Sequence, residues 1–228
     1  MYLMPTTTTT STPKTVIARL VQAITQAIAR GELLPGQRLV EADLQQQFEV
    51  GRSSVREALQ LLHSSGLVMM EVNKGAAVRK LDARELQDLF AIREQLEGLA
   101  ARLAAQQMRL AKAAQRKQLS ALLLRMEKVA KLDDAQAYNL LNREFHELLL
   151  TLSGNAQLQR LVAQLNLPIL VHQFRGFMQP ANKVASHAEH ARIAQAVLAG
   201  EADAAQRLMQ KHVRSGLRLV QQWAAQDE

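Results

Sequence analysis

The sequence predicts a mainly α-helical protein with two parts. The first part consists of three short helices followed by a β-hairpin, and the second is an antiparallel bundle built only of helices. Three observations lead to this prediction. Apolar residues recur at helical spacing from Val16 onward, two strand-like segments flank a turn at Asn73-Lys74-Gly75, and no strand pattern follows Asp82. Ala, Leu, Gln, Arg and Lys are abundant, which favours helices.

The first part reads as a winged helix-turn-helix. An amphipathic helix begins near Val16 and ends at Gly31, and a Leu-Pro-Gly-Gln-Arg turn at 34–38 separates it from the next helix. Ser53 is the candidate N-cap of a third helix, whose pattern stops at Gly66. The remaining expected elements are a short helix over 42–48 and two strands over 67–72 and 76–79.

The segment GRSSVREALQLLHSSG, residues 51–66, carries the clearest chemical signal. Arg52 and Arg56 are four residues apart, so both project from one side of the first helical turn, next to the small hydroxyls of Ser53 and Ser54. An arginine fork can bind the two acceptors of guanine or a phosphate, so this helix suits the major groove of DNA. The alternative is an ordinary solvated helix face that happens to carry two arginines.

From Asp82 onward the pattern predicts six or seven antiparallel helices with short connections. Asp133 or Asp134 caps one helix, Asn155 caps another that Pro168 interrupts, and Ser186 opens a later one that ends at Gly200. The expected helices span about 86–103, 112–130, 134–153, a segment from 155, 186–199 and 202–225.

Four side chains of the bundle form a candidate metal site. Asn142 and His146 are four residues apart on one helix face, and His190 and His212 come from two later helices. Three imidazoles and an amide oxygen could converge on a divalent ion in the core of a bundle. The alternative is that each of the three histidines is an ordinary surface or core residue.

Composition restricts the remaining possibilities. The chain has no cysteine, which excludes disulfides, zinc ribbons and thiol chemistry, and no apolar run reaches the ~18 residues of a spanning helix. The net charge of +7 is spread over both parts, so only its local placement argues for DNA. We expect a disordered tail at 1–13, a DNA-binding domain at 14–81, an effector-binding and dimerisation domain at 82–226, and a cytoplasmic location.

The order LPGQRL, VGRSSVREAL, GLV and NKGAAV resembles the DNA-binding head of the GntR family of bacterial transcription regulators, over about residues 14–80. The resemblance implies that Arg52–Arg56 enters the major groove and that Lys74-Gly75, at the wing tip, reaches toward the minor groove. Arg38 completes the expected DNA-binding set of Arg38, Arg52, Ser53, Ser54, Arg56, Lys74 and Gly75. The chain departs from the family at Ser54, often Pro, and at Ala77, often aromatic.

The second part is similar to the FCD ligand-binding domain of the FadR-type subfamily, through NREFHELLLTLSGN (142–155), SHAEHARIAQAVLAGEADAA (186–205) and MQKH (209–212). This FCD-like resemblance covers about residues 83–224. It implies metal ligands at Asn142, His146, His190 and His212, with zinc as the expected ion and nickel as the alternative. His187, one turn before His190, is the rival ligand.

An amide at position 142 leaves the charge of a divalent ion undiminished, so the centre should attract a small carboxylate effector. Arg93 and Arg175 could bind the far end of that anion, although Arg93 could equally form a structural ion pair with Glu97. The expected function is a ligand-responsive repressor that binds a pseudo-palindromic operator as a homodimer, without membrane attachment. The alternatives are a metal-dependent helical-bundle enzyme fused to a DNA-binding head, and a metal-stabilised dimerisation module without an effector.

Overall fold

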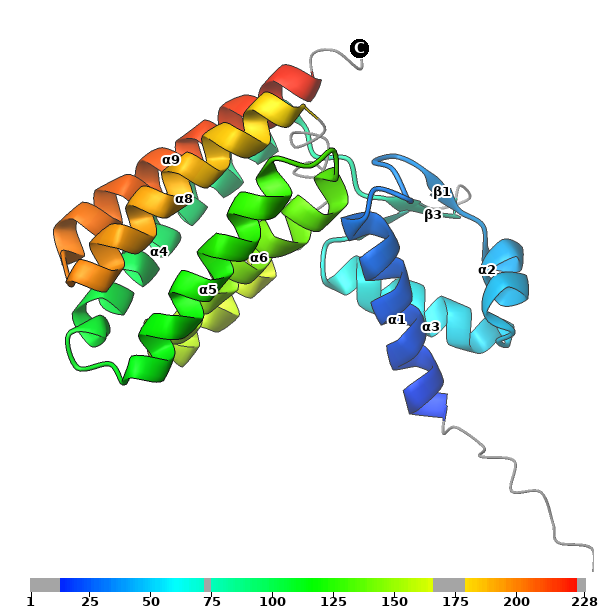
Figure 1. Cartoon of the computed structure of the whole chain (residues 1–228). Helices are drawn as coiled ribbons and strands as arrows, with labels where there is room; N and C mark the ends of the chain where they lie inside the picture. The colour runs from blue at the N-terminus through cyan, green and yellow to red at the C-terminus, as the bar shows by residue number, and fades with distance from the viewer. Residues whose placement is uncertain (1–12, 72–74, 166–178, 225–228) are drawn as a thin grey trace, which may run out of the picture. The chain divides into compact units, whose positions relative to one another are not determined.

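The computed structural model describes residues 13–71, 75–165 and 179–224 (Figure 1). Close contacts divide the chain into two compact units, with the boundary between Arg79 and Lys80. The expected tail at 1–13 and the effect of Pro168 fall almost wholly outside the described residues. Within them, no helix is both long and apolar enough to cross a membrane.

The first unit has the predicted helices and hairpin. Its core forms where Ile24 and Ile28 of the first helix pack with Val55, Leu59 and Leu62 of the third, all nearly without solvent exposure. Burial of such apolar surface stabilises the unit. Its elements are α1 (Pro13–Ala29), β1 (Arg38–Leu39), α2 (Glu41–Phe48), α3 (Arg52–Ser64), β2 (Val68–Glu71) and β3 (Gly75–Val78).

Two local expectations in this unit were wrong. The N-cap of α3 is Gly51, not Ser53, because the chain turns through Glu49 at φ 52° and the amides of Ser54 and Val55 bond to the Gly51 carbonyl. The antiparallel sheet also has a third strand, in the order β1-β3-β2, that the sequence did not indicate. A strand of two residues is too short to have an alternating pattern.

The second unit is the predicted helical bundle. Asp82 and Glu85 form a capping box at the start of the first helix, Asp134 caps the third, and Asn155 accepts a bond from the Leu158 amide. The labelled helices are α4 (Ala83–Met108), α5 (Ala113–Ala130), α6 (Ala135–Leu152), α8 (Pro180–Ala199) and α9 (Ala202–Ala224), and residues 156–165 are also helical.

The packing of α4, α6, α8 and α9 positions the site. Helix α9 runs along α4 and beside α8, while α4 also contacts α6 and α8 (Figure 1). The expectation that Ser186 opens a helix was wrong, since α8 begins at Pro180 and Ser186 lies inside it, buried. Proline suits the first helical position because its fixed φ fits and no amide is lost there. His190 therefore lies in the middle of α8 rather than in its first turns.

Candidate metal centre and DNA-recognition surface

The first turn of α3 presents two arginines to solvent. The side chains of Arg52 and Arg56 are 72% and 64% exposed, and Glu41 of α2 contacts both. Glu41 accepts a hydrogen bond from Arg52 Nε at 3.2 Å, and its other oxygen lies 3.8 Å from Arg56 Nε. One carboxylate thus holds both guanidinium groups in place on this surface.

Apart from Ser54, the other predicted DNA-contacting residues are exposed or lie outside the described residues. Arg38 in β1 and Gly75 at the start of β3 are exposed, and Gly75 has φ +81°, a conformation that favours glycine. Ser53 is exposed and Ser54 half-buried, while Lys74 is outside the described residues. The predicted contacts from 52 to 56 therefore share one helical turn.

Three of the four predicted metal ligands meet in the core of the bundle. His146 of α6, His190 of α8 and His212 of α9 offer ring nitrogens that all lie within 4.8 Å of one another. All three side chains are buried, and the His190–His212 and His146–His212 ring centroids are 4.3 and 5.3 Å apart. Imidazoles this close, drawn from three helices, can converge on one ion.

Two carboxylates orient these imidazoles. His146 Nδ1 bonds to Glu97 Oε2, and His212 Nδ1 lies 2.7 Å from Glu189 Oε2. Each contact occupies Nδ1 and leaves Nε2 as the ring nitrogen available for a ligand. A carboxylate bonded to the second nitrogen is the usual support of a metal-ligating histidine.

The cluster also contains buried polar atoms with no partner in the described structure. They are both ring nitrogens of His190, which is 0% exposed, and Asn142 Oδ1. A buried polar atom without a hydrogen bond costs free energy, and a cation bound to Asn142 Oδ1 and to one ring nitrogen of His190 would remove part of that cost. The donor set of three nitrogens and one amide oxygen fits a divalent cation such as zinc or nickel.

Burial favours the neutral form of two of these imidazoles, those of His190 and His212. It lowers the pKa of His190 well below its ordinary value, and the neighbouring imidazoles of His212 and His146 lower it further. Burial also lowers the pKa of His212, although the hydrogen bond with Glu189 opposes this effect. A neutral imidazole is the form that ligates a metal, so burial favours the ligating form of His190 and His212.

Arg93 forms the ion pair with Glu97 that the sequence left open as an alternative. Arg93 Nη2 lies 2.6 Å from Glu97 Oε1, and the two side chains are 4% and 2% exposed. Burial alone would raise the pKa of Glu97, but the charge of Arg93 and the contact with His146 hold that pKa well below its ordinary value. Arg93, Glu97 and His146 thus form one buried chain of charge-assisted bonds.

The other candidates lie elsewhere. His187 is outside the histidine cluster found among the described residues. Burial lowers its pKa, and the nearby charges of Glu127 and Lys131 also act on it. These neighbours place His187 on the side of α8 that faces α5. Arg175 is not among the described residues.

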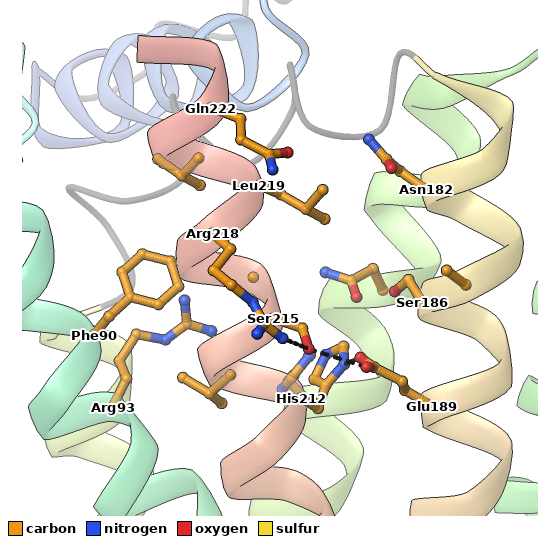
Figure 2. Close-up of a pocket in the computed structure, with 16 residues that line it drawn as sticks. Phe90, Arg93, Asn182, Ser186, Glu189, His212, Ser215, Arg218, Leu219 and Gln222 are labelled. Carbon is orange, nitrogen blue, oxygen red and sulfur yellow. Dashed lines mark hydrogen bonds and ion pairs between the residues drawn. The ribbon is translucent and has the colours of Figure 1, made fainter. Parts of the chain in front are cut away.

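A pocket of about 270 Å³ opens beside the cluster (Figure 2). Asn142, His146 and His212 line it, and so do Arg93, Glu189 and Arg218. The supporting role of Glu189 and the position of Arg218 were missed by sequence reasoning. Glu189 directly precedes His190, yet it supports His212 of the neighbouring helix, so only the packing of α8 on α9 reveals its role.

Comparison with known proteins agrees with this architecture. The domain described as "Bacterial regulatory proteins, gntR family" matches residues 17–78, and the FCD domain matches residues 88–215. The chain is 32% identical over 162 residues to the Nta operon transcriptional regulator of Aminobacter aminovorans, which covers 70% of this chain and 72% of that protein. It is also 32% identical over 144 residues to YdhC of Bacillus subtilis, an uncharacterized HTH-type transcriptional regulator, but that match spans only 61% of each chain.

Among solved structures, the fold is similar to that of McbR/YncC of E. coli, with a TM-score of 0.81 and 19% identity over 92% of this chain and 98% of that chain. The chain belongs to the GntR family of bacterial regulators and carries an FCD domain. It is therefore a DNA-binding transcriptional regulator and not an enzyme, and the predicted fold class is confirmed.

Proposed function

We propose that this regulator is a homodimeric repressor of the FadR type whose helical domain binds one divalent metal ion and a small carboxylate effector. The observation that carries the proposal is the buried cluster of His146, His190 and His212 beside a pocket. A dimer would bring two α3 helices to a pseudo-palindromic operator, and a protein bound across a promoter blocks transcription.

The surface of the first unit supports operator binding. Arg52 and Arg56 are long and exposed, so both are available to contact bases. Ser53 and Ser54 would allow close approach of the backbone, and Arg38, Lys74 and Gly75 would contact phosphates or the minor groove. The name of the Aminobacter relative supports control of an operon.

Asn142, His146, His190 and His212 would hold the metal, with zinc as the expected occupant and nickel as the alternative. When bound, the ion would supply a concentrated positive charge that attracts a carboxylate. Glu97 and Glu189 would orient two of the imidazoles through their Nδ1 atoms. Arg93 would support Glu97, so its predicted role as an effector clamp becomes secondary, while the role of Arg175 stays a prediction.

The metal part is tested by elemental analysis and by melting of the full chain before and after chelation. We expect one ion per protomer, and loss of that ion in His190→Ala. Metal at 1,000 times its dissociation constant stabilises the fold by about 4 kcal/mol, so chelation should lower Tm clearly. His187→Ala is the matched control, because it removes an imidazole one turn away on the same helix. Metal loss in His187→Ala but not in His190→Ala would contradict the assignment.

The effector part is tested by calorimetry with small organic acids and by DNA binding. An acid that binds should change operator affinity by the coupling factor, typically ~5–150-fold, and the operator should change acid affinity by the same factor. Silence across the acids with intact metal binding would favour a purely structural metal, and the pocket beside the cluster is the observation against that alternative.

A further inference from the structure

Two arginines of the described residues line the pocket, Arg93 and Arg218, but their charges are balanced differently. The guanidinium of Arg93 is buried and paired with Glu97, so its charge is already neutralised. Arg218 of α9 is exposed at the pocket and has no carboxylate partner in the described part of the chain. Its guanidinium donates a hydrogen bond from Nη2 to Ser215 Oγ at 3.1 Å. Of the two arginines, Arg218 is therefore the one whose charge is available to bind an anion.

Glu189, the carboxylate that lines the pocket among the described residues, does not compensate Arg218. Glu189 accepts a hydrogen bond from Ser215 Oγ at 3.0 Å, and its other oxygen bonds to His212 Nδ1. Arg218, Ser215, Glu189 and His212 thus form a continuous chain of polar contacts, drawn in part as dashed lines in Figure 2. Ser215 occupies one of the five N–H donors of the guanidinium, which leaves a fork for a second anion.

Arg218 lies close to the histidine cluster because it is six residues from His212 on the same helix. Its side chain reaches back along α9 to Ser215, which is three residues, or about 4.5 Å of helix rise, from His212 (Figure 2). The guanidinium of Arg218 and an ion held by the histidines would thus both face this pocket. The space is smaller than the pockets that hold drug-sized ligands, so only a short molecule can reach both.

We propose that Arg218 binds the second carboxylate of a small diacid whose first carboxylate approaches the histidine cluster. This inference rests on the proposed effector function and narrows it from carboxylates in general to short dicarboxylates. Phe90 and Leu219 supply apolar wall against the carbon chain, and Asn182 and Gln222 place amide groups at the far end (Figure 2). A monoacid of equal length would leave Arg218 without an anionic partner.

The test compares acids of matched length on the metal-loaded full chain. Isothermal titration with butyrate and succinate, pentanoate and glutarate, and hexanoate and adipate should give a preference for at least one diacid. A charge-assisted hydrogen bond contributes enough free energy that Arg218→Gln should weaken that diacid about 10- to 100-fold and leave its monoacid little changed. Arg218→Lys, which keeps the charge but not the fork, should fall between the two.

Arg207→Gln is the matched control, because Arg207 is an exposed arginine of α9 that does not line the pocket. It should behave as the wild type. A diacid preference that survives in Arg218→Gln, or no diacid preference in the wild type, would overturn the proposal. A preference that is lost in Arg218→Gln but persists in the chelated wild type would support Arg218 and contradict anchoring of the effector by the metal.

Discussion

Both units of this protein contain ion pairs between arginine and glutamate, but the pairs of one unit are exposed and the pair of the other is buried. In the DNA-binding unit, Glu41 contacts Arg52 and Arg56, and these side chains are 33%, 72% and 64% exposed. In the bundle, Arg93 and Glu97 are 4% and 2% exposed, and Glu97 also bonds to His146. The residue types are the same, but water screens the first group and is excluded from the second.

This difference decides what each arginine can do. An exposed ion pair contributes about 0–1 kcal/mol, so Arg52 and Arg56 can leave Glu41 for DNA at little cost. A buried pair cannot be separated so easily, because a buried charge without its partner is strongly unfavourable. Exposure therefore makes arginine available for recognition, whereas burial makes it part of the scaffold. The four predictions below test this contrast, from the largest expected effect to the smallest.

Removal of the buried arginine should have the largest effect on stability. Arg93→Ala leaves Glu97 buried without its main counter-charge, and we expect the free energy of unfolding to fall by about 3–5 kcal/mol in chemical denaturation. Arg84→Ala, an exposed arginine on the same helix, is the control and should change little. The double variant Arg93→Met with Glu97→Gln should recover part of the loss. Equal stability of Arg93→Ala and Arg84→Ala would contradict the structural role of the buried arginine.

Removal of the exposed arginines should affect DNA binding instead. Arg52→Ala and Arg56→Ala should each weaken operator binding by roughly 1–3 kcal/mol and relax the preference at one base position, with little change in unfolding. Lys74→Ala should weaken binding to all DNA sequences more uniformly and reduce the salt dependence of DNA binding. Competition gel shifts measure both effects. If both arginine variants kept the affinity and sequence preference of the wild type, α3 would not be the reading helix.

A negative charge added beside the histidine cluster should weaken binding of the effector. Asn142→Asp places one negative charge among the buried donors with little change in size, so the metal should bind at least as tightly. An anionic effector should bind more weakly by roughly 1–2 kcal/mol, since the centre is partly neutralised. Paired titrations of metal and acid on the two proteins measure this. Unchanged or tighter acid binding would mean that the anion does not approach the metal.

The smallest expected effect is that of Glu41. Glu41→Gln should change the free energy of unfolding by less than about 1 kcal/mol, because the pairs it breaks are exposed. It should, however, tighten binding to non-operator DNA severalfold, since a carboxylate beside the two arginines repels phosphate. Glu57→Gln, an exposed acid on α3, controls for the change in net charge. A loss of affinity for all DNA in Glu41→Gln alone would instead show that Glu41 is needed to position the arginines.

The sequence by itself determined the features that depend on neighbouring residues. Helical spacing of apolar residues, the caps at Asp134 and Asn155, and the glycine at position 200 with φ +74° are local matters, and they predicted the helices and their ends. The same reasoning placed Asn142 and His146 on one face of a helix. Local rules failed where two signals competed, as at Ser186, where an internal serine was mistaken for a cap although Pro180 starts the helix.

Only the tertiary structure decided which distant side chains meet. Nothing in the sequence joins Glu97 to His146, Glu189 to His212, or Arg218 to the pocket, because helix packing brings these residues together. The tertiary structure likewise shows that Arg93 is buried and paired with Glu97. Sequence fixes the face of a helix that a side chain occupies, but the crossing of α4, α6, α8 and α9 sets the distances and the exclusion of water, on which charge and metal chemistry depend.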